Sequence, residues 1–149
     1  MGFFFLLYLY YGYIVFLGFD ISYFSGQTIA IDFDNSVLLS VAPVKFYANA
    51  DTNKAQILKE NRSKSGIYQW VNLSNGKTYV GSSSNLTVRF MQYFNIKYLL
   101  RNNTMAICNA MFYHGYSKFS LTVLEYSDKT NLIKKEQFYL DFLQPEYNI

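Results

Sequence analysis

The sequence predicts an α+β fold, in which a small antiparallel sheet of three strands is flanked by helices. Strand-like runs surround an Asn-Gly pair at 75–76, and another recurs at 118–126. Apolar residues at helical spacing fill the segments between and after these runs. The predicted domain covers residues 66–149, preceded by a hydrophobic leader and linker at residues 1–65.

The stretch GIYQWVNLSNGKTYVG, at residues 66–81, predicts a β-hairpin. Its strands are 66–72 and 77–81. Asn75-Gly76 between them is the favoured pair for a two-residue type I′ turn, because both turn positions need positive φ.

That turn predicts the register of the hairpin. Asn72 would face Tyr79, and Tyr68 would face Ser83. Side chains alternate between the two faces of a strand, so Tyr68 and Tyr79 would share one face. They would lie about 13 Å apart along the strands, flanking a site without touching. Ordinary packing of half-buried tyrosines explains the same pattern.

The remaining elements follow from periodicity. In SSSNLTVRFMQYF, at residues 82–94, apolar residues lie on one helix face. The cap is expected at one of three neighbouring positions: Ser83, Ser84 or Asn85. The later elements are a helix over 105–113 ended by Gly115, a strand over 118–126, and a helix over 131–143 stopped before Pro145.

Residues 2–19 carry no charge, and the run is just long enough for a membrane helix of about 20 apolar residues. Three interpretations stay open: a marginal membrane helix, an unusual targeting segment, or a translated leader with no part in the fold. We favour the third. Residues 51–60 predict a short helix capped by Asp51 or Thr52, and residues 61–65 a linker.

The composition excludes a disordered chain and two kinds of cysteine-based structure. With 51% hydrophobic and 20% aromatic residues, the chain is too apolar to be disordered. Its single cysteine, Cys108, excludes an internal disulfide framework and a cysteine-cluster metal site, and favours a core thiol. Heavy use of residues with A/T-rich codons indicates an A/T-rich genome, such as that of an organelle or of some bacteria.

Charge is distributed unevenly along the chain. No acidic residue lies between Glu60 and Glu125, and this gap indicates a surface for a polyanion, although chance is the alternative. The basic residues of the gap are Arg62, Lys64, Lys77, Arg89, Lys97, Arg101 and Lys118.

Two charged residues suggest phosphate chemistry. Arg89 is expected one turn into a helix with Tyr93 at i+4, and a guanidinium matches the geometry of a phosphate. Glu136, in the last predicted helix, could supply a hard oxygen ligand for one divalent ion. The alternatives are a solvated arginine and a surface carboxylate paired with a lysine.

The chain resembles the GIY-YIG nuclease superfamily, and most closely the homing endonucleases encoded by group I introns of fungal mitochondria. The resemblance covers GIYQWVNLSNGKTYVGSSSNLTVRF, MAICNAMFYHGYSKFSLTVLEY and EQFYLDFLQPEYNI in order. It implies hydrolysis of phosphodiester bonds in double-stranded DNA with one divalent metal ion, Mg²⁺ before Mn²⁺. It implies no protein partner.

The resemblance also implies roles. Tyr68 and Tyr79 are the tyrosines of the two triplets, and one of them, Tyr68 by preference, positions or deprotonates the attacking water. Arg89 steadies the phosphate charge and Glu136 binds the metal. Supporting roles fall to Lys77, Tyr93 and Asn148, and Gly66 and Gly81 are structural. Contacts to DNA are expected from Lys77, Arg89, Lys97, Arg101 and Lys118.

One position departs from the pattern of the resemblance. Homing members often carry histidine four residues after the arginine, where this chain has Tyr93. A tyrosine is also a poor base at its ordinary pKa of ~10, so the scheme needs the metal or a cation such as Lys77 nearby.

Two other functions stay open. One is a decayed nucleic-acid-binding remnant without catalysis, and the other is a protein anchored in a membrane through residues 2–19, which we do not favour. The expected location is the mitochondrion, and we favour the matrix over the membrane. Because such endonucleases usually continue into DNA-binding modules, we expect a fragment, a truncated reading frame or a nuclease of weak specificity.

Overall fold

The computed structural model describes residues 7–10, 13–16, 20–24, 27–31, 37–38 and 43–148. The chain forms two compact units, Met1–Pro43 and Val44–Ile149. Much of the predicted leader, residues 2–19, lies outside the described residues. Within the described part, no helix is long and apolar enough to cross a membrane.

The first unit is described through five short strands. Two of them pair in an antiparallel hairpin, and the others form a three-stranded antiparallel sheet in chain order. The strands are β1 (Leu7–Tyr10), β2 (Tyr13–Phe16), β3 (Asp20–Phe24), β4 (Gln27–Ile31) and β5 (Val37–Leu38).

The second unit is built on an antiparallel sheet of four strands, in the order β6-β9-β7-β8. These strands are β6 (Lys45–Tyr47), β7 (Gly66–Asn72), β8 (Thr78–Ser83) and β9 (Phe119–Tyr126). The predicted α+β class is confirmed. The sheet has one strand more than the predicted three, because β6 pairs with β9 at the edge.

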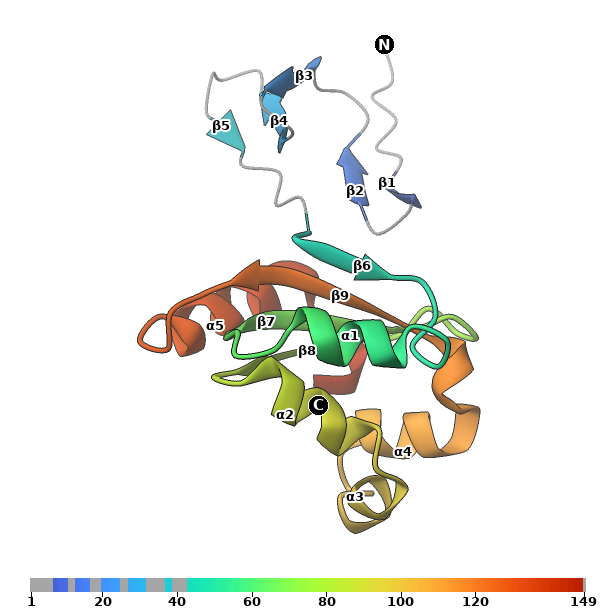
Figure 1. Ribbon diagram of the computed structural model, residues 1–149. Coiled ribbons are helices and arrows are strands. Elements are labelled where there is room, and N and C mark those ends of the chain that lie inside the picture. The colour runs from blue at the N-terminus through green and yellow to red at the C-terminus, as the bar shows by residue number, and fades with distance from the viewer. Residues whose placement is uncertain are drawn as a thin grey trace. The chain divides into compact units, whose positions relative to one another are not determined.

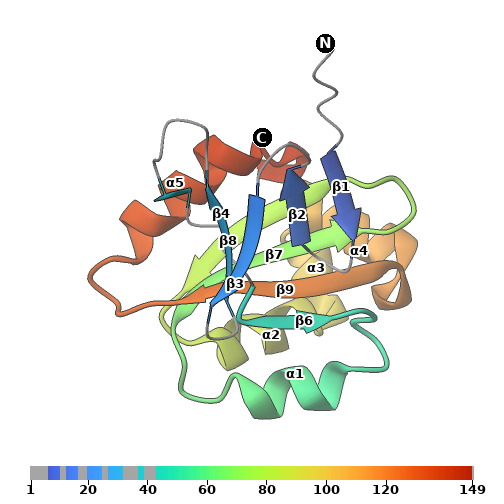
Figure 2. The same ribbon diagram turned by 90° about the horizontal axis from the view of Figure 1, so that it is seen from above.

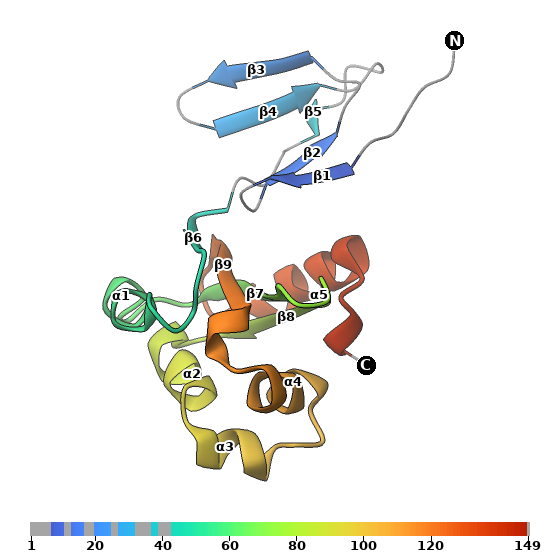
Figure 3. The same ribbon diagram turned by 90° about the vertical axis from the view of Figure 1, so that its right-hand side faces the viewer.

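Helices surround this sheet. They are α1 (Lys54–Glu60), α2 (Leu86–Tyr93), α3 (Ile96–Arg101), α4 (Ala106–His114) and α5 (Leu132–Leu143), with short 3₁₀ helices η1 (Tyr116–Lys118) and η2 (Glu146–Asn148). Figures 1 and 3 show α2, α3 and α4 together on one side of the sheet. Figure 2 shows α5 alongside β8 and α1 alongside β6.

Local chemistry explains the ends of these helices. The Asn85 side chain accepts a hydrogen bond from the amide of Val88 and so caps α2. Asn85 was one of the three predicted cap positions. Gly115 ends α4 with φ of 80°, a conformation that favours glycine. The sequence did not predict α3, a single short helix capped by the side chain of Asn95.

The segment expected to be leader and linker belongs in part to the second unit. Tyr47 of β6 and Ile57 of α1 are buried in its core. Asn61, in the expected linker, is fully buried, donates to the Tyr47 hydroxyl and accepts from Tyr126. The compact unit therefore begins at Val44, and residues 44–65 fold as part of it. The predicted cap of α1 is wrong, because Asn53 occupies that position and its side chain makes no cap bond.

The hairpin register differs from the prediction. Tyr79 pairs with Trp70, and Tyr68 pairs with Gly81. The connection is longer than a two-residue turn: the Asn72 amide bonds the Lys77 carbonyl, and in the residues between them only Gly76 has positive φ. A type I′ turn needs two such residues. The longer loop moves Tyr79 closer to Tyr68 while keeping it on the same face.

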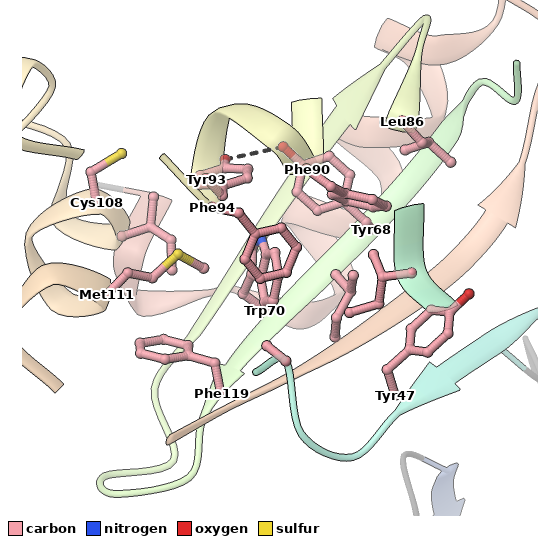
Figure 4. Close-up of a cluster of buried hydrophobic side chains, with 14 of the residues drawn as sticks. Tyr47, Tyr68, Trp70, Leu86, Phe90, Tyr93, Phe94, Cys108, Met111 and Phe119 are labelled. Atoms are coloured by element: carbon pink, nitrogen blue, oxygen red, sulfur yellow. Dashed lines mark hydrogen bonds between the residues drawn. The ribbon is translucent and has the colours of Figure 1, made fainter. Parts of the chain in front are cut away.

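The two faces of the sheet bury different clusters. Tyr68 and Trp70 of β7 face the helices α2 and α4, and Figure 4 shows both packed with Phe90 and Tyr93. On the opposite face a smaller cluster packs Ile67, Val80 and Leu124 of the sheet against Leu132 and Tyr139 of α5. The tyrosines of the hairpin therefore point into the larger core.

Candidate active site

Three tyrosines meet where the hairpin packs on α2. Tyr68 is 1% exposed, and its hydroxyl lies 3.1 Å from the Tyr93 hydroxyl in a hydrogen bond that Figure 4 shows. The ring centroids of Tyr68 and Tyr79 are 6.4 Å apart. The two tyrosines therefore form one packed cluster, and the predicted separation of about 13 Å is wrong because the loop is longer than a two-residue turn.

Gly81 makes this cluster fit. A Cβ added at Gly81 would lie 2.6 Å from the Tyr68 hydroxyl and 2.9 Å from a ring carbon of Tyr79. Gly66 has a similar steric role, because a Cβ there would lie 2.3 Å from the backbone oxygen of Glu125. The glycine of each triplet thus leaves space that neighbouring atoms fill.

Arg89 lies beside the tyrosines on α2. Its Nη1 donates to Oε1 of Gln92 and to the hydroxyl of Tyr98, both at 3.3 Å. The side chain is half-buried. Within residues 43–148, no carboxylate lies within salt-bridge distance of it.

Glu136 lies on α5, which packs on the face of the sheet opposite the tyrosines. Its Oε2 accepts a hydrogen bond of 2.7 Å from the hydroxyl of Ser82, whose side chain lies on the face of the sheet opposite Tyr68 and toward α5. Because β8 is an edge strand, groups on its two faces can approach around that edge. The structure thus brings Tyr68, Tyr79, Tyr93 and Arg89 into one cluster and holds Glu136 next to it.

Burial dominates the electrostatics of the tyrosines. Loss of water contact raises the pKa of Tyr68 well above its ordinary value of 10.0, and it raises the pKa of Tyr79 in the same direction. The positive charge of Arg89 lowers both pKa values by less, and the negative charge of Glu136 raises both. Both hydroxyls are therefore protonated near neutral pH. Their nearby cation is Arg89 and not Lys77.

The other predicted basic residues lie apart from this cluster. Lys97 and Arg101 are exposed on α3, two residues or fewer from its ends. Lys77 is exposed after the hairpin loop, where its charge lowers the pKa of Glu146, although less than the bond from the Thr78 amide does. Lys118 is exposed beside the same loop, since its carbonyl accepts from the amide of Leu73.

Asn148 pairs with the outer edge of β8. Its side chain accepts from the Val80 amide at 2.8 Å and donates to the Val80 carbonyl at 2.7 Å. Glu146 accepts from the amide of Thr78 on the same edge. The amide of Asn148 thus takes the place of a neighbouring strand at this position.

The sequence prediction missed three polar residues near the site: Gln92, Tyr98 and Ser82. The sequence could have indicated Gln92, because it lies three residues after Arg89 and i and i+3 residues of a helix are neighbours. Ser82 follows the second triplet directly, but its bond to Glu136 could be predicted only if the position of α5 were known. Tyr98 lies on a different helix from Arg89, and nothing in the spacing indicates that the two helices meet.

The donor set for a metal ion is small. Within the described residues, no group of three His, Cys, Asp or Glu side chains converges. Glu136 is half-buried and uses one carboxylate oxygen on Ser82, while no described residue bonds the other. A single carboxylate fits a Mg²⁺ ion, which keeps several waters and takes its other ligands from substrate phosphates.

Comparisons with known proteins give a match to one family and to two solved structures. Residues 64–148, more than half of the 149, match the sequence model of the GIY-YIG catalytic domain. The structure is similar to the catalytic domain of the homing endonuclease I-TevI, with 30% identity, 54% of this chain and 89% of that chain covered, and a TM-score of 0.46. A mutant of the catalytic domain of the intron endonuclease I-TevI gives 29% identity, 54% and 84% coverage, and a TM-score of 0.46.

Proposed function

The chain belongs to the GIY-YIG family of catalytic domains and is an endonuclease domain, and from that premise we propose how it acts. It hydrolyses phosphodiester bonds of double-stranded DNA with the help of one divalent metal ion, Mg²⁺ before Mn²⁺. Arg89, Tyr79 and Glu136 contact the reacting groups. Tyr68 and Tyr93 hold Tyr79 in place.

The observation that carries this proposal is the position of Arg89. A guanidinium stays charged at every physiological pH, and buried arginines are normally paired with an anion. Arg89 is half-buried, yet no carboxylate of residues 43–148 pairs with it. A phosphate group would supply the missing charge, and Arg89 would stabilise the negative charge that builds on it during hydrolysis.

The two triplet tyrosines have different access to such a phosphate. Tyr68 is 1% exposed and its hydroxyl is already bonded to Tyr93, whereas Tyr79 is half-buried. Burial therefore favours Tyr79, and not Tyr68, as the residue that meets the attacking water. Because its pKa is raised, Tyr79 enters the reaction protonated and first orients the water through its hydroxyl.

Glu136 is the residue that would hold the metal ion. Ser82 fixes one oxygen of its carboxylate and leaves the other to bind. When bound, a divalent ion supplies positive charge to the phosphate and lowers the pKa of a coordinated water. Lys77, Lys97, Arg101 and Lys118 are exposed and would contact the DNA backbone, which makes binding weaken with salt.

Nicking of a supercoiled plasmid with Mg²⁺ tests the proposal. Glu136→Ala should abolish nicking while the salt-sensitive affinity for DNA stays within about twofold, since the phosphate contacts remain. Asp141→Ala is the matched control, because Asp141 is exposed on the same helix α5, and it should nick at the parent rate. If the parent binds DNA and never nicks it, the chain is a non-catalytic remnant. If Glu136→Ala nicks as fast as the parent, the metal assignment is wrong.

We also propose that the domain serves intron homing in mitochondria, with the first residues of the chain translated from an upstream exon. The abundance of residues with A/T-rich codons and the uncharged run at residues 2–19 support this. Sequencing the DNA around the gene tests it. An upstream exon in frame with residues 2–19 is expected, and an isolated gene in a bacterial chromosome would contradict it.

A further inference from the structure

The guanidinium of Arg89 is tethered on one side by two neutral acceptors from different helices. Gln92 lies one turn further along α2, and Tyr98 lies on α3. Both accept hydrogen bonds from the same nitrogen, Nη1, at 3.3 Å. Neither acceptor carries a charge, so the tether fixes the direction of the guanidinium without neutralising it.

The choice of nitrogen matters for phosphate binding. A guanidinium has five N–H donors, of which Nη1 carries two, and Gln92 and Tyr98 take one each. Within residues 43–148, Nε and Nη2 donate to no other group. These two nitrogens form the side edge of the guanidinium, which binds two oxygens of one phosphate at once. The tether thus leaves that edge open.

Tyr98 is itself held firmly. The side chain of Asn95 caps α3 by accepting from the amides of Lys97 and Tyr98. The ring of Tyr98 packs edge-on against Tyr93, with centroids 6.4 Å apart, and Tyr93 bonds Tyr68. Tyr98 therefore connects the position of Arg89 to the packed tyrosine cluster.

We propose that Tyr98, together with Gln92, is a positioning residue that aims the open edge of Arg89 at the scissile phosphate. This inference rests on the proposed nuclease function for its effect on rate. The tether itself is a property of the folded chain and is independent of DNA. Without the Tyr98 hydroxyl, Arg89 keeps one tether and samples more rotamers before it meets the phosphate.

Tyr98→Phe tests the proposal, because it removes the hydroxyl and keeps the packed ring. We expect the single-turnover cleavage rate at saturating DNA to fall about 10- to 100-fold, as for a lost hydrogen bond to a charged group. The Kd for DNA should stay within about twofold, because the phosphate contacts of the exposed lysines remain. Tyr113→Phe is the matched control: Tyr113 is 82% exposed on α4, and its variant should cleave like the parent.

A double-mutant cycle separates positioning from a general structural effect. In an Arg89→Lys background the forked guanidinium is absent. Adding Tyr98→Phe to that background should therefore lower the single-turnover cleavage rate by less than a further twofold. If Tyr98→Phe slows both backgrounds equally, or slows neither, the positioning role is wrong. Unfolding of both variants, followed by the fluorescence of Trp70, checks that the fold is intact.

Side-chain NMR of Arg89 tests the tether without relying on cleavage. If the parent fails to cleave DNA, the proposed nuclease function is overturned, and the NMR result still decides whether Tyr98 tethers Arg89. In the parent, rotation of the Nη1 group should be slow enough to give separate signals for its two hydrogens. In Tyr98→Phe these signals should merge. Identical rotation in the parent and in Tyr98→Phe would overturn the tether.

Discussion

A methyl group at Gly81 would collide with the two triplet tyrosines. In Gly81→Ala the new Cβ would stand 2.6 Å from the Tyr68 hydroxyl, 2.7 Å from its Cζ and 2.9 Å from a ring carbon of Tyr79. The backbone at Gly81 does not have positive φ, so any cost arises from this collision. Tyr68 cannot swing aside easily, because it is 1% exposed and packs edge-on against Phe90.

The magnitude follows from two effects. Overpacking a dense core costs about 1–3 kcal/mol, and displacing the Tyr68 hydroxyl also breaks its bond to Tyr93, worth about 1 kcal/mol. We therefore expect the free energy of unfolding to fall by about 2–4 kcal/mol. With a slope on the order of 2 kcal/mol per M, the urea midpoint should fall by about 1–2 M.

Trp70 makes the assay specific to this domain. It is the single tryptophan of the chain and is fully buried next to Phe90 and Tyr93, so its fluorescence follows unfolding of this core. Gly76→Ala is the control: no atom lies within 4 Å of its added Cβ, and its positive φ costs about 1 kcal/mol. If Gly81→Ala unfolds at the same urea concentration as the parent, Tyr68 does not fill the space beside Gly81.

Three further changes have defined outcomes. Asn148→Ala should increase the rate of hydrogen exchange at the Val80 amide, because that amide donates to the Asn148 side chain; an unchanged rate would contradict the pairing. The free energy of unfolding should fall as the pH rises above 10, because burial raises the pKa of Tyr68 above 10.0 and the unfolded chain loses that proton first. Tyr68→Phe should make the fall shallower, and an equal fall would show that other groups cause it. A chain starting at residue 64 should be much less stable in urea than one starting at residue 44, because it lacks the buried Ile57; equal midpoints would show that α1 is dispensable.

The hairpin shows where sequence periodicity is strong and where it is weak. Alternation placed Tyr68 and Tyr79 on one face, and this is confirmed, because a register shift by a whole pair preserves the face. The loop length was wrong, since Asn75-Gly76 is compatible with more than one loop. Asn75 has no positive φ, and its side chain instead accepts from the amide of Lys77. This side-chain bond competes with the type I′ turn.

Short elements were the ones that sequence patterns missed. Strand β6 has three residues and α3 has six, too few for a period to stand out. Both depend on tertiary partners: β6 pairs with β9, and Leu99 of α3 is buried in the larger core. The longer elements β9 and α5 were predicted within about one residue of their ends, as their stronger patterns allow.

The position of Glu136 shows why a site is harder to predict than a fold. The sequence alone does not assign Glu136 to a face of the sheet, and in the structure α5 packs on the opposite face from Tyr68 and Tyr79. What brings them near each other is that β8 is an edge strand and carries alternate side chains to both sides. Ser82 holds Glu136 on one side, and Gly81 admits the Tyr68 hydroxyl on the other. Two adjacent residues of one strand thus position the acid and the tyrosines independently. A change at Ser82 should therefore affect metal binding without moving the tyrosine cluster. A change at Gly81 should instead move the tyrosine cluster without affecting metal binding.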